Sequence, residues 1–231
     1  MIIDAINIVD LEPKLILLTE ESFQSPLGDE LLQVCRNEKI APYVTLVSDN
    51  VLKACSNTMN PQGVVAAFNR PSNNILSETS SHILILDTLS DPGNIGTLIR
   101  TAYGLGFDSV ICIGGADPYS PKAVRSSMGS CLLLPVLEKN WEDISELLSS
   151  SNLNNVPIFV AELNPINTIP YYQASLKDPC IIIIGSEAHG VSEQALSLPN
   201  SQSIYIPMKQ NLESLNAAMA GAIIMAEAKK N

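Results

Sequence analysis

Residues 87–102, DTLSDPGNIGTLIRTA, bring together residue types that can bind a polar ligand. An Asp-Pro-Gly-Asn turn ends an apolar run, and a helical pattern follows at once. This arrangement puts backbone N–H groups, the amide of Asn94 and the guanidinium of Arg100 at one edge of a sheet, where α/β proteins bind ligands. A plainer interpretation makes Asn94 a helix N-cap and Arg100 an ordinary exposed charge. The turn by itself leaves both interpretations open.

The elements that position these side chains can be read from the spacing of apolar residues. Residues 83–86 form a short, continuous apolar run, which is typical of a strand buried on both faces of a parallel sheet. After the turn, apolar residues recur at i, i+3, i+4 and i+7: Ile95, Leu98, Ile99 and Ala102. This spacing predicts a helix with one face packed on the sheet and Arg100 off that face.

Strand and helix patterns alternate from residue 83 to the end of the chain. The further strands are expected at residues 109–113, 132–136, 158–161, 181–184 and 203–206. The further helices are expected at residues 122–128, 141–149 and 216–229. Such alternation predicts an α/β fold with a mostly parallel sheet covered by helices on both faces.

The N-terminal part of the chain predicts a smaller α/β domain. Its expected strands are residues 15–18, 43–47 and 63–68, and its expected helices are residues 28–37 and 49–55. A polar segment rich in Asn, Ser and Thr follows, which indicates a linker. We therefore expect a first domain at residues 1–70, a linker at 71–81 and a second domain at 82–231.

Composition excludes several classes of protein. The 231 residues are 46% hydrophobic, which suffices for a proper core, yet no run approaches the ~20 apolar residues of a membrane span. The five cysteines are scattered without a C-x-x-C pair, and only two histidines are present. We therefore expect free buried thiols, no metal site and no Ser-His-Asp hydrolase. The N-terminus carries no signal-peptide pattern, so we expect a cytoplasmic protein, with an organelle as the alternative.

The formal net charge of −11 is unfavourable for a nucleic-acid partner, because phosphate neutralisation supplies most non-specific affinity. Any RNA site must therefore be local. Three basic residues are expected to flank the proposed ligand site: Arg100, Lys122 and Arg125. The alternative is a solvated surface with no nucleic-acid partner.

Two later stretches, CIIIIGSEAHGVS at residues 180–192 and SIYIPMKQNLESLNA at residues 203–217, add to the first. Together the three resemble, in order, spacing and polar positions, the signature motifs of the SpoU (TrmH) branch of the SPOUT methyltransferases. That family uses S-adenosylmethionine to methylate a ribose 2′-hydroxyl in RNA. The resemblance covers the last two-thirds of the chain. One position departs from it, since Gln210 stands where the family usually carries glycine.

The resemblance implies roles for particular residues. It implies that the cofactor is bound by Gly185, Ile206 and Leu215. It implies a polar active site made of Asn94, Arg100, Glu187, Ser214 and Asn216. Of these, Arg100 matches a residue proposed to activate the hydroxyl. Because a guanidinium has a pKa above about 12, we expect Arg100 to stabilise charge and orient phosphate rather than to act as a base.

The resemblance also implies a C-terminal trefoil knot, a homodimer and a small ribosomal-protein-like N-terminal domain, here in a shortened form. We therefore expect an RNA 2′-O-ribose methyltransferase that uses S-adenosylmethionine on rRNA or tRNA, with no metal and no membrane association. One alternative is a catalytically inactive knotted protein that binds RNA or assists assembly. Another is a nucleotide-dependent enzyme on a Rossmann-like sheet, although neither G-x-G-x-x-G after a strand nor G-x-x-x-x-G-K-[ST] occurs.

Overall fold

The computed structural model forms two compact units, Met1–Ser72 and Asn73–Asn231. It describes residues 2–7, 11–37, 43–56, 58, 60–71, 81–150, 153–163, 166–209 and 214–230. Residues 72–80 of the expected linker lie outside the described residues, as does Gln210. The domain boundary inferred from composition therefore stays a prediction.

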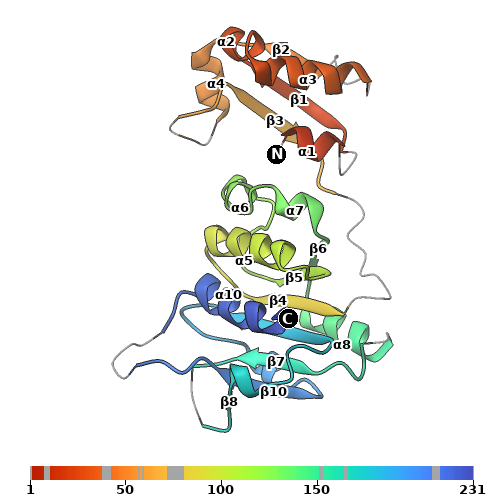
Figure 1. Ribbon diagram of the computed structural model, residues 1–231, viewed down its shortest axis with the longest axis vertical. Coiled ribbons are helices and arrows are strands. Elements are labelled where there is room, and N and C mark those ends of the chain that lie inside the picture. Colours follow the sequence, from red (N-terminus) through yellow and green to blue (C-terminus); the bar gives the residue numbers. More distant parts are fainter. Residues whose placement is uncertain are drawn as a thin grey trace. The chain divides into compact units, whose positions relative to one another are not determined.

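The first unit is built on a three-stranded sheet (Figure 1). Its central strand β1 (Pro13–Leu18) pairs in parallel with β2 (Val44–Leu46) and antiparallel with β3 (Val64–Phe68). The helices of this unit are α1 (Ile2–Asn7), α2 (Glu20–Phe23), α3 (Pro26–Asn37) and α4 (Asp49–Cys55). Its core brings α1 and α3 against β1: Ile6, Ile16, Leu18, Leu31 and Val34. The three strands and two helices expected from the sequence are present, whereas the short helices α1 and α2 were not predicted.

The second unit is built on a seven-stranded sheet in which every paired strand is parallel. Its strands are β4 (His82–Asp87), β5 (Ser109–Ile113), β6 (Val136–Lys139), β7 (Ile158–Ala161), β8 (Ile169–Pro170), β9 (Cys180–Gly185) and β10 (Ser201–Tyr205). They lie in the order β6-β5-β4-β9-β7-β10-β8. The expected parallel sheet is confirmed, and β9 lies between β4 and β7. The knot stays a prediction.

Helices cover both faces of this sheet. They are α5 (Pro92–Gly104), α6 (Pro121–Ser126), α7 (Ser130–Leu133), α8 (Trp141–Ser150), α9 (Glu193–Leu196) and α10 (Ala217–Ala228), with a 3-10 turn η2 (Tyr171–Gln173). Figure 1 shows α5 and α10 side by side, and their residues share one core cluster. Residues of α8 and α9 belong to a second cluster.

The two clusters divide the sheet residues by strict alternation. Leu84 and Leu86 of β4 pack with α5 and α10, whereas Ile83 and Ile85 pack with α8. All four side chains are at most 1% exposed. The middle of β4 is covered on both faces, which explains why residues 83–86 form a continuous apolar run.

The start of α5 differs from the plainer interpretation of the sequence. Asp91, not Asn94, is the N-cap, because the Asp91 carboxylate accepts a hydrogen bond from the N–H of Gly93 at 3.0 Å. Pro92 follows as the first helical residue, where its missing N–H costs nothing. Asn94 therefore lies inside the first turn, and its side chain is available for other contacts. The apolar face from Ile95 to Ala102 is buried as expected.

The prediction of a strand at residues 132–136 is wrong. Residues 130–133 form the short helix α7, and strand β6 begins only at Val136. Gly129 has a left-handed φ of 82°, which starts a tight turn, and the N–H of Leu134 donates to the carbonyl of Ser130 at 2.9 Å. Pro135 then ends the turn, because it has no N–H to donate. A short apolar run can bury itself equally well as one helical turn.

No helix among the described residues combines the length and apolarity needed to cross a membrane. Within the same residues, no three His, Cys, Asp or Glu side chains lie close enough together to hold a metal ion. Cys112, Cys131 and Cys180 are buried free thiols, and burial raises the pKa of Cys112 and Cys180 to about 12. Cys55 is exposed, contrary to expectation, and the Cys35 side chain lies outside the described residues.

Candidate active site

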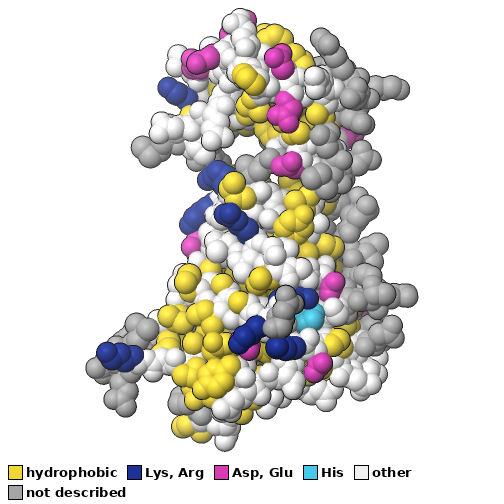
Figure 2. Space-filling model, viewed as in Figure 1, with side chains coloured by type: hydrophobic (Ala, Val, Ile, Leu, Met, Phe, Trp, Pro, Cys, Tyr) yellow, Lys and Arg dark blue, Asp and Glu magenta, His cyan; other side chains and the backbone are white. Residues whose placement is uncertain are grey.

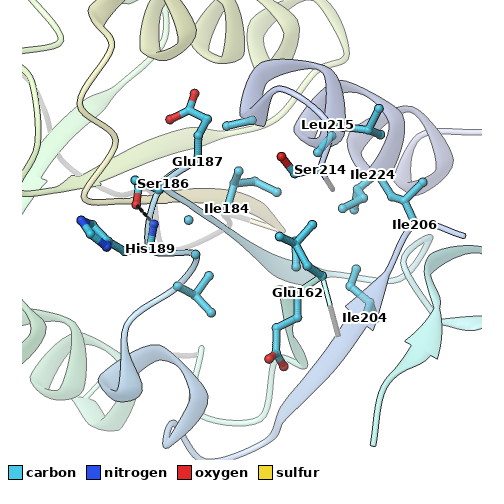
Figure 3. Close-up of a pocket in the computed structure, with 18 of the residues that line it drawn as sticks. Glu162, Ile184, Ser186, Glu187, His189, Ile204, Ile206, Ser214, Leu215 and Ile224 are labelled. Atoms are coloured by element: carbon cyan, nitrogen blue, oxygen red, sulfur yellow. Dashed lines mark hydrogen bonds between the residues drawn. The ribbon is translucent and has the colours of Figure 1, made fainter. Parts of the chain in front are cut away.

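A cavity of about 410 Å³ opens at the carboxyl ends of β7, β9 and β10, where the start of α10 closes it (Figure 3). Ligands of open parallel sheets bind at this edge, and the volume suits a small organic molecule. One side of the cavity is an apolar wall made of Ile184, Ile204, Ile206, Leu215 and Ile224. The cavity can therefore receive a flat apolar ring.

All three residues expected to bind the cofactor, Gly185, Ile206 and Leu215, line this cavity. Two of the expected catalytic residues, Glu187 and Ser214, line it as well. The sequence motifs at residues 180–192 and 203–217 therefore meet at one place in the fold.

Gly185 ends β9 at a point where the chain folds back on itself. A Cβ atom built there would lie 2.2 Å from the carbonyl oxygen of Gly190 and 2.4 Å from the backbone nitrogen of Val191. Ser186 and Gly190 exchange backbone hydrogen bonds of 2.9 Å in both directions, which closes the loop. Glycine is therefore required at residue 185 because backbone, not a ligand, occupies the space of its missing side chain.

Asn94 and Asn216 reach Glu187 through a chain of hydrogen bonds. The Nδ2 of Asn94 donates to the Oε1 of Glu187, and the Nδ2 of Asn216 donates to the Oδ1 of Asn94 at 3.0 Å. Asn216 is the N-cap of α10, and its Oδ1 accepts from the N–H groups of Ala218 and Met219 at 3.0 and 3.3 Å. Three residues from three distant motifs are thus held in one network.

The start of α10 determines which atoms donate and which accept in these hydrogen bonds. Because the Oδ1 of Asn216 must face the helix N–H groups, its Nδ2 is the atom left to donate. Asn94 then has to accept on its oxygen and donate from its nitrogen. Glu187 receives the last N–H on its Oε1. The network therefore fixes the position of the Glu187 side chain at the rim of the cavity.

A hydrogen bond to Asp87 holds the loop that carries Glu187 against the sheet. Asp87 ends β4 and is fully buried, and its Oδ2 accepts from the N–H of Ser192 at 2.6 Å. Within the loop, the Oγ of Ser186 accepts from the N–H of His189 at 3.2 Å (Figure 3). The His189 side chain is exposed although it lines the cavity. The position of Glu187 therefore depends on contacts made on both sides of it in the sequence.

Arg100 is not among the residues that line the cavity. It lies on the exposed side of α5, and neither Arg100 nor Arg125 makes an ion pair with another described residue. Lys122 does pair, with Asp91 at 2.5 Å, and this hydrogen bond lowers the pKa of the Asp91 carboxyl. The residues expected to contact RNA thus lie on α5 and α6, beside the cavity rather than in it.

Sequence reasoning missed Glu162, which lines the same cavity. Figure 3 shows the side chains of Glu162 and Glu187 at opposite ends of the labelled group. Glu162 directly follows β7. Its position at the carboxyl end of an expected strand could therefore have identified it as a site candidate. Two carboxylates in one cavity favour a ligand that carries positive charge.

The chain is similar in sequence to proteins of one known family. The model of the SpoU rRNA Methylase family matches residues 81–226, which include every expected active-site residue. A 23S rRNA (guanosine(2553)-2'-O)-methyltransferase of Bacillus subtilis is 32% identical over 90% of this chain and 84% of its own length. An uncharacterized tRNA/rRNA methyltransferase of Synechocystis is 34% identical over 80% of this chain, which spans 66% of that protein.

A solved structure shows the same architecture. It is an AdoMet-bound rRNA methyltransferase from Sinorhizobium meliloti, 26% identical, with a TM-score of 0.84 over 99% of this chain and 84% of that protein. The match therefore includes the first unit as well as the second. The chain belongs to the SpoU rRNA Methylase family.

Proposed function

We propose that this protein transfers a methyl group from S-adenosylmethionine to a ribose 2′-hydroxyl of ribosomal RNA. The observation that carries the proposal is the cavity whose rim holds Glu187 through Asn94 and Asn216. Relatives that match over most of the chain are named as rRNA 2'-O-methyltransferases, which supports ribosomal RNA as the substrate.

The cavity has the features that this cofactor requires. An adenine ring can lie against Ile204, Ile206 and Ile224, and Gly185 lines the same cavity. The carboxylates of Glu162 and Glu187 favour a ligand with positive charge. When bound, the cofactor supplies an electrophilic methyl group on a positively charged sulfur.

The residues of the chain orient the ribose and ease the loss of its proton. The Oε1 of Glu187 accepts from Asn94, which leaves Oε2 as a proton acceptor at the rim. We assign to Glu187 the task of receiving a hydrogen bond from the ribose hydroxyl, and to Arg100 that of stabilising negative charge on its oxygen. Ser214 adds a hydroxyl on the α10 side of the cavity. Because this network is held before substrate arrives, little reorganisation is needed.

The first prediction tests the function directly. Calorimetry should show that the protein binds S-adenosylmethionine and its demethylated product, with the same affinity when EDTA is present. Tritiated methyl should then pass to ribosomal RNA purified from cells that lack this protein, at a ribose that resists alkaline cleavage. Binding of ATP or NAD in place of these compounds would contradict the proposal.

The same experiment separates the enzyme from an inactive RNA-binding relative. An inactive protein would bind ribosomal RNA and leave the methyl on the cofactor. We favour the enzyme because Asn94, Glu187 and Asn216 retain a complete hydrogen-bond chain, which a binding protein would not need.

A second prediction concerns the first unit, for which we propose a role in RNA recognition. A chain that starts at about Ser77 should stay folded and bind the cofactor, because the second unit contains the whole cavity and its own core clusters. Its affinity for ribosomal RNA should fall. Unchanged RNA affinity would remove the first unit from recognition, and unfolding would move the boundary.

We further propose that the chain forms a homodimer and that its C-terminal segment is knotted, as the family implies. The position of Arg100 outside the cavity of its own chain supports an arrangement in which a second copy brings this residue to the site. Sedimentation equilibrium should give twice the mass of one chain. A monomer that is fully active would contradict this arrangement.

A further inference from the structure

The turn that follows α6 holds a methionine in an unfavourable backbone conformation. Met128 has a φ of 52°, and Gly129 after it has a φ of 82°, so two successive residues are left-handed. The N–H of Met128 donates to the carbonyl of Arg125 at 3.0 Å, and the N–H of Gly129 donates to Val124 at 3.1 Å. A residue with a side chain rarely adopts this conformation unless its surroundings impose it.

The strained turn does not bury the side chain that it carries. Met128 is 59% exposed, whereas its neighbour Ser127 is fully buried and Cys131 is 1% exposed. Core packing therefore does not explain a methionine at this position, and backbone preference disfavours it. A flexible, polarisable apolar side chain held out into solvent is suited to contact a partner.

The turn lies directly against α5. A Cβ atom added at Gly96 would lie 2.7 Å from the Cβ of Ser126 and 2.9 Å from the backbone nitrogen of Ser127, so the two helices touch at this point. Arg100 lies four residues after Gly96 and therefore on the same side of α5. Arg100 is exposed on this side of α5.

Two basic residues lie on α6, the helix that leads into this methionine. Figure 2 shows basic side chains gathered over α6, the helix that carries Lys122 and Arg125. Lys122 is neutralised in part by Asp91, whereas Arg100 and Arg125 have no acidic partner among the described residues. Asn94, at the rim of the cavity, lies only two residues before Gly96 on α5. Helix α5 thus connects the rim of the cavity with α6, whose basic residues precede Met128.

We propose that Met128 contacts the face of an unstacked nucleobase that flanks the methylated nucleotide, while Arg100 and Arg125 hold adjacent phosphates. The inference rests on the proposed function, since it takes ribosomal RNA as the partner. Sequence-specific recognition of RNA uses unstacked bases, which stack on aromatic or Arg side chains. In DNA complexes, apolar side chains that include Met contact base faces in the same way. On a chain with a net charge of −11, α6 carries Lys122 and Arg125 together, and such a local basic group can bind phosphates.

Met128→Gly is the informative variant, because glycine accepts a φ of 52° and removes the side chain without strain. With ribosomal RNA from cells lacking this protein, its KM for RNA should rise about five- to tenfold, whereas kcat and cofactor affinity stay close to the parent values. Met128→Leu is the matched control, and it should restore most of the loss because it keeps an apolar side chain.

The salt dependence of filter binding to the same RNA separates a base contact from a phosphate contact. Arg125→Ala should reduce the slope of log affinity against log salt by about one, because one phosphate contact is lost. Met128→Gly should weaken binding equally at every salt concentration and leave the slope unchanged. A slope lowered by Met128→Gly would overturn the assignment to a base.

Other outcomes distinguish this inference from the proposed function. If Met128→Gly binds RNA with parental affinity, the proposed base contact is wrong, but the proposed methyl transfer by the parent protein is unaffected. If the parent binds ribosomal RNA without transferring methyl, the proposed function fails, and filter binding still measures the contact. Absence of RNA binding by the parent would overturn both. Dissociation of a dimer by Met128→Gly, with parental RNA affinity per chain, would assign the residue to a protein interface and overturn the inference.

Discussion

Replacing Gly185 with alanine should abolish measurable binding of S-adenosylmethionine. The added methyl group would lie 2.2 Å from the carbonyl oxygen of Gly190, and backbone cannot yield as a flexible side chain does. The hydrogen bonds that close the loop between Ser186 and Gly190 would break, and Glu187 would move from the rim of the cavity. Overpacking of this kind also lowers the free energy of unfolding by about 1–3 kcal/mol.

Gly104→Ala is the matched control for this variant. Gly104 is the last residue of α5, and no atom lies within 4 Å of its built Cβ. Alanine there should leave cofactor binding unchanged and raise helix stability by up to about 1 kcal/mol. Calorimetry of both variants, with thermal unfolding beside it, measures the two effects. Parental cofactor affinity in Gly185→Ala would show that the loop is not held against β9 as described.

The long elements of the second unit could be predicted because their burial repeats in the sequence. Strand β9 is apolar throughout because both of its faces are covered, and α5 shows one apolar stripe because one of its faces is covered. The residues at the carboxyl ends of these strands were therefore identifiable as site candidates. The roles of Gly185 and Glu187 came from the family resemblance, and both residues line the cavity at the end of β9.

Short elements and side-chain networks could not be predicted in the same way. The helices α2, α7 and α9 have four residues each, too few for a helical period to appear. The bond between Asn94 and Asn216 joins residues 122 positions apart, and its direction depends on the cap of α10. The spacing of residues in the sequence cannot predict such a contact. The strain at Met128 was equally invisible, because only backbone geometry reveals it.

Arg100→Ala should cut methyl transfer by roughly 10²-fold or more while fold and cofactor affinity stay unchanged. This is the scale expected when a preorganised charge is removed from an active site. Arg100 is exposed on α5 and does not line the cavity, so neither the core nor the cofactor pocket loses a contact. Single-turnover transfer to ribosomal RNA, with calorimetry of the cofactor, measures both parts of the expectation.

Arg100→Lys tests what kind of positive charge is needed. Lysine keeps the charge but loses the planar fork that holds two oxygens at once, so we expect it to restore little activity. Near-parental transfer by the lysine variant would show that a diffuse positive field is sufficient. Unaltered transfer by the alanine variant would remove Arg100 from the site altogether.

Mixing two inactive variants tests whether Arg100 acts on the cavity of a second chain. Asn216→Ala removes the donor that orients Asn94, so it disables the cavity of its own chain, whereas Arg100→Ala leaves that cavity intact. If Arg100 reaches across a dimer, a mixed dimer pairs one intact cavity with one intact arginine, and transfer returns at that single site. If Arg100 serves its own chain, each chain of the mixed dimer lacks one of the two groups, and the mixture stays as inactive as its components.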